Sequence, residues 1–177
     1  MADTAAQKGR EAMPSGFPPI AAPDARVLIL GTMPSEASLQ KQQYYGYGRN
    51  AFWPILYGPV GRALRGGLRK ALPFFDRAGI ALWDVLAACD RPGSADAAIR
   101  NPEPNDMAAF AAGHPRIERL FFNSANAAAL YERLAQPDPF SGVGRQTLPS
   151  TSPARAMRFE DKLEQWRLVR RFLDGNG

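Results

Sequence analysis

Residues 44–53 combine side chains that can hold a nucleobase next to a phosphate backbone. Within residues 44–50 lie three tyrosines, two glycines, one arginine and one asparagine. Aromatic rings offer flat faces for base stacking, glycines let backbone N–H groups approach a phosphate, and the amide of Asn50 can pair with a base edge. The segment therefore indicates nucleic-acid chemistry; the alternative is a tyrosine-rich turn in which Asn50 caps the following helix.

A second segment, residues 148–155, has the composition of a loop that can grip DNA. Pro149 and Pro153 stiffen a backbone that carries three hydroxyl side chains, and Arg155 ends the segment. Hydroxyls, backbone amides and an arginine can bind a phosphate, and a rigid proline loop can press against stacked bases. Taken alone, the same residues also fit an ordinary serine- and proline-rich turn before a helix.

Short apolar runs are the elements that must position these segments. Three runs are each followed at once by a glycine or a polar residue: residues 27–30 before Gly31, residues 80–83 before Asp84 and residues 120–122 before Asn123. Such runs are typical of strands buried on both faces of a parallel sheet, and a fourth short strand is expected before Leu148. Ligands bind at the carboxyl ends of parallel strands, so the residues that follow the four strands are expected to converge on one site.

The residues between these predicted strands include segments with apolar residues at helical spacing. Helices are expected at residues 51–72, 107–113, 124–134 and 159–173. A polar loop of about twenty residues is expected after Asp84. The alternation predicts an α/β fold, a three-layer α/β/α sandwich with a short central four-stranded parallel sheet. A chain of 177 residues suits one such domain, which we place at residues 24–177 behind a flexible tail of residues 1–23.

The composition excludes several kinds of site. Cys89 and His114 are single residues of their types, so neither an internal disulfide nor a zinc cluster can form. We expect no metal and no cofactor, since no glycine-rich dinucleotide or P-loop pattern occurs. No apolar run approaches the ~20 residues of a membrane span, so we expect a cytoplasmic monomer without membrane contact. The net charge of +5 permits an anionic partner, and residues 31–77 hold seven basic side chains against two acidic ones.

As a set, these segments resemble the uracil-DNA glycosylase superfamily and, within it, the hypoxanthine-DNA (deoxyinosine) glycosylase family. The similar segments occur in chain order: residues 31–34, residues 44–53 with the pattern Tyr-Tyr…Arg-Asn-x-Phe-Trp, residues 82–86 and 91–101, residues 122–124, and residues 148–155. The resemblance covers residues 26–173. It implies a uracil-DNA glycosylase-like fold and an enzyme of base-excision repair. Such an enzyme flips a deaminated base out of double- or single-stranded DNA and hydrolyses its N-glycosidic bond.

The resemblance also implies roles for single residues. Tyr45 falls where related enzymes stack an aromatic ring on the flipped base, and Asn50 falls where the family has a catalytically important asparagine. Met33 stands where most of the superfamily has the Asp or Asn that activates or positions water. Leu148 stands where the uracil enzymes have a histidine. Both departures are shared with the deoxyinosine family and argue against strong uracil activity.

These residues make up a predicted site with three kinds of contact. The catalytic candidates are Asn50, for positioning water or contacting the base, and Asp84, for orienting water or favouring a cationic sugar. The predicted base contacts are Thr32, Met33, Tyr45, Phe52 and Asn123, and the predicted DNA contacts are Arg49, Ser150, Thr151, Ser152, Pro153 and Arg155. Asn123 fits equally well as a residue that ties its strand end to a neighbouring loop.

The sequence leaves the substrate open. Hypoxanthine presents an O6 acceptor beside an N1–H donor, and uracil presents O4 and N3–H in the same order, so one carboxamide can satisfy either base. We expect excision of hypoxanthine, with uracil or xanthine as further substrates. Two alternatives stay open: an enzyme that acts mainly on uracil, and a module that binds lesion or abasic DNA without turnover.

Overall fold

The centre of the protein is a short sheet in which every neighbouring pair of strands is parallel. The computed structural model describes residues 13–57 and 68–175. The spatial order of the strands is β2-β1-β5-β6. Their bounds are Val27–Gly31 for β1, Ile80–Asp84 for β2, Arg119–Phe122 for β5 and Gly144–Thr147 for β6. Both β1 and β2 are buried along their whole length, as expected of apolar strands with both faces covered.

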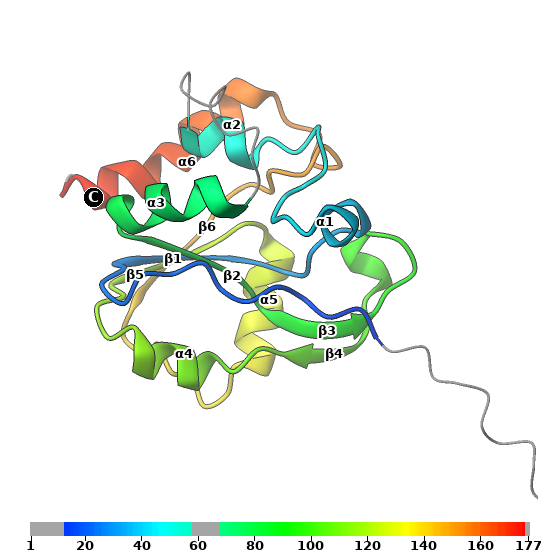
Figure 1. Ribbon diagram of the computed structural model, residues 1–177, viewed down its shortest axis with the longest axis horizontal. Helices are drawn as coiled ribbons and strands as arrows, with labels where there is room; N and C mark the ends of the chain where they lie inside the picture. The colour runs from blue at the N-terminus through cyan, green and yellow to red at the C-terminus, as the bar shows by residue number, and fades with distance from the viewer. Residues whose placement is uncertain (1–12, 58–67, 176–177) are drawn as a thin grey trace, which may run out of the picture.

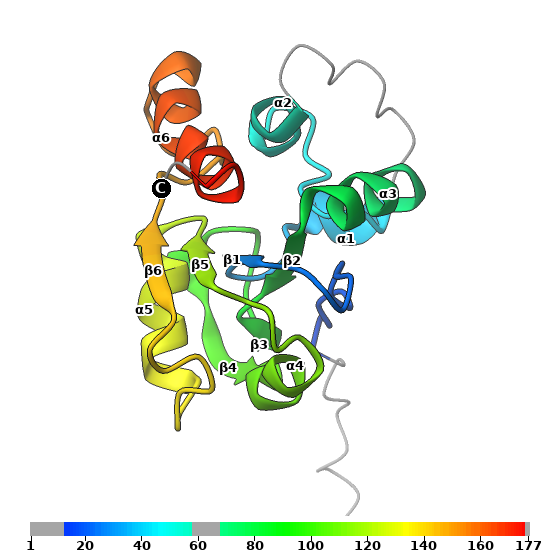
Figure 2. The same ribbon diagram turned by 90° about the vertical axis from the view of Figure 1, so that its left-hand side faces the viewer.

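Helices cover both faces of this sheet (Figures 1 and 2). On one face lie α2 (Phe52–Tyr57), α3 (Leu68–Ala78) and α6 (Phe159–Leu173), and on the other lie α4 (Met107–Gly113) and α5 (Ala125–Leu134). The short helix α1 (Glu36–Lys41) follows β1. This arrangement confirms the predicted three-layer α/β/α sandwich with a four-stranded parallel sheet. Among the described helices, none has the length and apolar character needed to cross a membrane.

The register of the sheet brings the strand ends to one level. Gly31 pairs with Asp84, and Phe122 pairs with both Leu30 and Thr147. The next residues continue the pattern, since the N–H groups of Asn123 and Leu148 donate to the carbonyl oxygens of Leu30 and Phe122, each at 2.9 Å. The polar residues that end these strands therefore meet at one edge of the sheet.

Two stretches differ from the sequence predictions. The expected polar loop after Asp84 instead contains an antiparallel hairpin of β3 (Leu86–Asp90) and β4 (Arg100–Pro104), with the single 3-10 turn η2 (Asp96–Ala98) between them. The sequence of β4 is RNPEP, which has neither apolar alternation nor β-propensity to indicate a strand. The helix expected at residues 51–72 ends at Tyr57, and α3 begins at Leu68; residues 58–67 lie outside the described residues.

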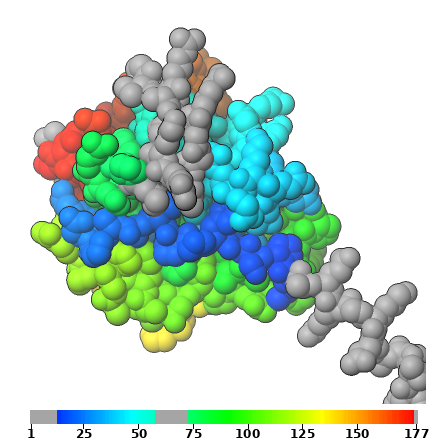
Figure 3. Space-filling model, viewed as in Figure 1, coloured from blue at the N-terminus to red at the C-terminus, as the bar shows by residue number. Residues whose placement is uncertain are grey.

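The N-terminal segment packs against the sheets from Ser15 onward. Ser15 forms an antiparallel bridge with Ala88, and Ile20 forms one with Leu82 on the edge strand β2. Figure 3 shows the segment, in blue, crossing one face of the molecule. Ile20 is only 1% exposed, so the later part of the segment that we expected to be a flexible tail belongs to the core. It also covers the otherwise open edge of the sheet; residues 1–12 are not among those described.

Candidate active site

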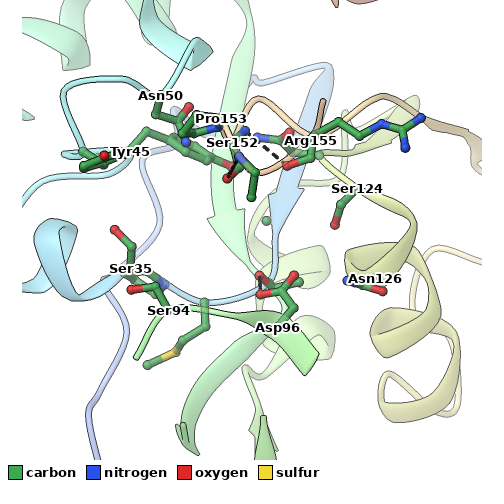
Figure 4. Close-up of a pocket in the computed structure, with 18 of the residues that line it drawn as sticks. Ser35, Tyr45, Asn50, Ser94, Asp96, Ser124, Asn126, Ser152, Pro153 and Arg155 are labelled. Atoms are coloured by element: carbon green, nitrogen blue, oxygen red, sulfur yellow. Dashed lines mark hydrogen bonds between the residues drawn. The ribbon is translucent and has the colours of Figure 1, made fainter. Parts of the chain in front are cut away.

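A cavity of about 1090 Å³ lies over the carboxyl ends of the strands. Its lining includes Gly31 at the end of β1 with the three residues that follow it, Asp84 at the end of β2, and Asn123 after β5. Figure 4 shows two facing sides: Asn50, Ser152, Pro153 and Arg155 lie on one, and Ser94 and Asp96 lie on the other. Segments that are far apart in the sequence thus enclose a single space large enough for a nucleobase and its sugar.

In this cavity the carboxyl group of Asp84 and the hydroxyl of Tyr45 both lie next to Gly31. A β-carbon added to Gly31 would lie 2.4 Å from Asp84 Oδ1 and 2.9 Å from Tyr45 Oη. Both distances are shorter than a van der Waals contact, so a larger residue at position 31 would displace the carboxyl group and the phenol. The glycine at the end of β1 is therefore what lets these two polar groups approach each other.

Two polar atoms of this cluster have no hydrogen-bond partner among the described residues. They are Asp84 Oδ2 and Tyr45 Oη, and both are buried. Burial raises the pKa of Asp84 to about 7; the positive charge of Arg91 opposes the rise and the carboxylate of Asp96 adds to it. Burial, with a contribution from Asp84, also raises the pKa of Tyr45. Unpaired buried groups are rare in native proteins, and a bound ligand would satisfy both of these.

The ring of Tyr45 is held in an unusual backbone conformation. Its φ of 50° lies in the left-handed region, which non-glycine residues seldom adopt outside turns and functional sites. The ring stacks on Phe52 with centroids 3.8 Å apart and planes 20° apart. Phe52 is fully buried and is not part of the cavity lining, so it supports Tyr45 from behind. The base contact that we predicted for Phe52 is therefore not available in this conformation, whereas Tyr45 lines the cavity.

Asn50 lines the cavity and also bonds to the start of a helix. Its Oδ1 accepts the N–H of Phe52, the first residue of α2, at 3.0 Å. Ala51 occupies the N-cap position, since its carbonyl oxygen accepts the Ile55 N–H, so Asn50 supports the helix start from one residue before the predicted cap. Its Nδ2 donates to no described residue, and an amide oxygen has a second lone pair. Asn50 can therefore hold the helix start and still offer a donor and an acceptor to a ligand.

Asn123 joins the end of β5 to the second predicted DNA-binding segment. Its Nδ2 donates to Thr151 Oγ1 and its Oδ1 accepts the Thr151 N–H, both at 2.9 Å. The carbonyl oxygen of Thr151 in turn accepts the N–H of Ala51 at 3.0 Å. Thr151 is 1% exposed and does not line the cavity, so this residue joins the two segments and does not present its hydroxyl to DNA.

The segment of residues 152–155 forms a rigid rim. The carbonyl oxygen of Ser152 accepts a hydrogen bond from Lys162 Nζ at 2.8 Å and one from the N–H of Arg155 at 3.1 Å. Lys162 is 2% exposed, and burial together with the nearby Arg155 lowers its pKa. Trp166 Nε1 donates to the carbonyl oxygen of Pro149, three residues before the rim, at 2.8 Å.

The remaining predicted DNA contacts divide between the rim and the outer surface. Ser150, Ser152, Pro153 and Arg155 all line the cavity, and Pro153 and Arg155 are exposed there. Arg49 is exposed but does not contribute to the lining. Its predicted role is thus limited to DNA that extends beyond the cavity.

Sequence reasoning assigned no site residue to the loop between β3 and β4, yet this loop forms one side of the cavity. Thr32 Oγ1 donates to Asp96 Oδ1 at 3.0 Å, and Arg91 lies 3.9 Å from the same oxygen. The N–H of Glu36 donates to Ser94 Oγ at 3.0 Å. Together these contacts attach the loop to residues 31–36. Two signals were available: the similarity of residues 91–101 to the family, and an acidic residue in a Gly- and Ser-containing turn shortly after the strand-end Asp84.

The chain is similar to known proteins over most of its length. The sequence model of the Uracil DNA glycosylase superfamily matches residues 18–174. A hypoxanthine DNA glycosylase of Methanosarcina acetivorans is 35% identical over 157 residues, which cover 87% of this chain and 96% of the relative. One of Methanosarcina barkeri is 30% identical over 152 residues, covering 85% and 94%. A solution NMR structure from Methanosarcina acetivorans, provisionally described as a uracil DNA glycosylase, superposes with a TM-score of 0.75 at 33% identity over 90% of this chain and 98% of that chain.

Proposed function

Because the chain belongs to the uracil DNA glycosylase superfamily, we propose that it removes hypoxanthine from DNA by hydrolysing the N-glycosidic bond and leaving an abasic site. That it is a DNA glycosylase follows from the family and from its relatives. Two relatives at 30–35% identity are named hypoxanthine DNA glycosylases, which supports this base as the main substrate. Uracil and xanthine are proposed as further substrates.

The proposal is carried by the convergence of Tyr45, Asn50 and Asp84 on one cavity. Tyr45 Oη and Asp84 Oδ2 are buried without partners, and Asn50 bonds to the described residues only through its Oδ1. The flipped base stacks on the exposed side of the Tyr45 ring, whose other face is covered by Phe52. The Nδ2 of Asn50 donates to O6 of hypoxanthine, and its carbonyl oxygen accepts from N1–H or from a water molecule. Met33, which is buried in the lining, adds an apolar contact and no water-activating group.

The rim supplies the DNA contacts in this proposal. Extruding a base from a duplex costs a few kcal/mol and costs least for a mispaired base such as hypoxanthine. Pro153 presses against the stack that the base leaves, and Arg155 binds a flanking phosphate. The internal hydrogen bonds of the rim reduce the entropy lost when it contacts DNA.

Cleavage of the bond gives the sugar the character of an oxocarbenium ion. The site then needs a held base, a positioned water molecule and a field that favours positive charge on the sugar. Asn50 and Asp84 are the catalytic residues of this proposal. Both line the cavity, Asp84 Oδ2 is buried without a partner, and the Asn50 side chain makes one hydrogen bond, through Oδ1, to the described residues.

An excision assay tests the function. Duplex and single-stranded oligonucleotides that contain one deoxyinosine, deoxyuridine or deoxyxanthosine are incubated with the protein and treated with alkali, which cuts the strand at abasic sites. We expect scission at deoxyinosine to be fastest and an undamaged oligonucleotide to stay intact. Faster scission at deoxyuridine would establish the uracil alternative, and binding without scission at every lesion would establish the non-catalytic module.

A further inference from the structure

The cavity contains a carboxyl group, Asp96, that has both a hydrogen-bond donor and a cation beside it. Thr32 Oγ1 donates to its Oδ1 at 3.0 Å, and the guanidinium of Arg91 lies 3.9 Å away. The side chain of Asp96 is 25% exposed and lines the cavity. Figure 4 shows it across the cavity from Asn50 and Pro153. A hydrogen-bond donor and a cation therefore face this carboxyl group.

The second carboxyl group of the cavity, Asp84, has the opposite surroundings. It is 4% exposed, and its Oδ2 has no hydrogen-bond partner among the described residues. The charged and titratable groups that act on it are Tyr44, Tyr45, Arg91 and Asp96. Within the described part of the chain no cation lies within 4.0 Å of Asp84; Arg91 is directed instead to Asp96 and to the carbonyl oxygen of Pro34. A buried carboxyl group without a cation is most stable in its neutral form.

The two groups are joined through two consecutive residues of the first motif. Gly31 is paired with Asp84 in the sheet and leaves room for its Oδ1, which would lie 2.4 Å from a β-carbon at position 31, and Thr32 donates to Asp96. We propose that Asp96, as the ionised member of this pair, stabilises the cationic sugar and accepts a proton from the attacking water, while Asp84, as the neutral member, donates its proton to N7 of the leaving purine. The inference rests on the proposed function and deepens it. Pairs of carboxyl groups in unlike environments divide acid and base roles in this way in enzymes that cleave glycosidic bonds.

The proposed step balances in atoms and charge. The bond between C1′ and N9 breaks, and its electron pair goes to the purine. The proton of Asp84 goes to N7, so hypoxanthine leaves as a neutral molecule. The water oxygen forms a bond to C1′, and one water proton goes to Asp96. Asp84 then regains a proton and Asp96 loses one to the solvent, which restores the starting state.

This division of roles also favours a purine substrate. Uracil has no atom equivalent to N7, so proton donation by Asp84 aids only the purine. In this chain Met33 and Leu148 offer no group for water activation or for a departing pyrimidine anion. In the proposal Asp96 supplies the water activation, and Asp84 assists the leaving base only when that base is a purine.

The test is the pH dependence of single-turnover excision of deoxyinosine by the full chain. In the native protein we expect the rate to fall as pH rises above about 7, the value to which burial raises the pKa of Asp84. Asp84→Asn should be slower and should lose this fall. Asp96→Asn should be at least ~100-fold slower at unchanged DNA affinity. The rate of this variant should still decrease at high pH, but the decrease should begin at a lower pH, because the negative charge of Asp96 helps raise the pKa of Asp84.

Glu103→Gln is the matched control, since Glu103 is an exposed carboxylate on β4 of the same hairpin. It should retain the native rate and pH profile. Thermal unfolding of each variant checks that it is folded. Thr32→Val removes only the hydrogen bond to Asp96, so its excision rate should fall, but by less than that of Asp96→Asn. The proposal is overturned if Asp96→Asn keeps the native rate or if Asp84→Asn keeps the alkaline fall. A native protein that excises neither deoxyinosine nor deoxyuridine would instead overturn the proposed function.

Discussion

The inner residues of the cavity and its rim differ in how their polar groups are satisfied. The inner residues, Gly31, Tyr45, Asn50, Asp84 and Asp96, include a phenol and a carboxyl oxygen that are buried without partners. The rim, residues 152–155, is braced by hydrogen bonds from a buried lysine and from its own backbone. The unpartnered groups of the inner residues can bond to a ligand, whereas the rim makes its hydrogen bonds within the protein and does not need a ligand to keep its conformation.

The difference between the inner residues and the rim also indicates which of them acts in the reaction and which binds DNA. Interactions inside the cavity are shielded from solvent, so they act strongly on charge that develops during the reaction. The exposed Arg155 acts on phosphates through solvent, and salt weakens such contacts. We therefore expect substitutions of inner residues to change the rate of excision, and substitutions of the rim to change DNA affinity.

The largest effect that we expect is a change in the free energy of unfolding when Asp84, which can carry a charge, is replaced by Asn. Burial raises its pKa to about 7, above the ~3.9 of an unfolded chain, so the folded protein binds this proton more tightly. The contribution of Asp84 to the free energy of unfolding is thus fully present below about pH 4 and is lost as pH rises through about 7. We expect Asp84→Asn to be up to about 4 kcal/mol more stable than the native protein at pH 8 and no more stable at pH 4.

Urea unfolding at the two pH values measures this change. Asp76→Asn, at an exposed position of α3, is the control and should show the native pH dependence. An Asp84→Asn protein with the native pH dependence would mean that this carboxyl group is ionised in the folded state, contrary to its role as an inner proton donor.

The next largest effect is expected at Gly31. In Gly31→Ala the new β-carbon must displace Asp84 Oδ1 and Tyr45 Oη, which lie 2.4 and 2.9 Å from its position. A displacement of about 1 Å in a catalytic group costs about 100-fold in rate, so excision should fall by that factor with little change in DNA affinity. Gly48→Ala is the control, because nothing lies within 4 Å of a β-carbon there. Equal rates for the two variants would show that the position of the inner groups is unimportant.

A smaller effect is expected from the phenol of Tyr45. Its hydroxyl has no partner in the free protein, so Tyr45→Phe should keep or raise the stability, by about 1 kcal/mol at most. Excision should fall about tenfold if the substrate supplies the missing partner. Tyr131→Phe is the matched contrast, since that hydroxyl donates to Asp138 at 2.6 Å; it should lose stability and keep its rate. A native excision rate in Tyr45→Phe would show that this hydroxyl does not contribute to excision.

The smallest effect is expected at the rim. Arg155→Ala should weaken binding to a deoxyinosine duplex severalfold and reduce the slope of log affinity against log salt by about 1, since one phosphate contact is lost. Its excision rate at saturating DNA should stay native. Arg170→Ala removes another exposed arginine, paired with Asp174 at 3.1 Å on α6 and outside the cavity lining, and should change neither quantity. An unchanged salt slope in Arg155→Ala would exclude the phosphate contact.

Much of this fold could be predicted because its strands are short, apolar and buried. The runs at residues 27–30 and 80–83 are strands, and the last predicted helix matches α6. Parallel strands end at one edge, so the convergence of Asp84 and Asn123 followed from the strand positions alone.

What could not be predicted depends on contacts between distant residues. The strand β4 has a polar sequence and forms by pairing with β3. Residues 91–101 were among the segments similar to the family, but the sequence did not show that Asp96 lies beside the cavity. The direction of a side chain is likewise a property of packing. Phe52 and Thr151 lie in the expected motifs but are buried in the interior. Lys162 is also buried, and its ammonium group donates a hydrogen bond to the carbonyl oxygen of Ser152.

The central claim, that the inner residues carry the chemistry and the rim carries the binding, is tested most directly at Asn50. The measurement is the single-turnover excision rate of Asn50→Ala on a deoxyinosine duplex, alongside its dissociation constant for the same DNA and both values for Arg155→Ala. The account predicts that Asn50→Ala loses about 100-fold or more in rate with nearly native affinity, the reverse of Arg155→Ala. Equal losses of rate and affinity in Asn50→Ala would instead make this residue a structural support for the start of α2 and contradict the account.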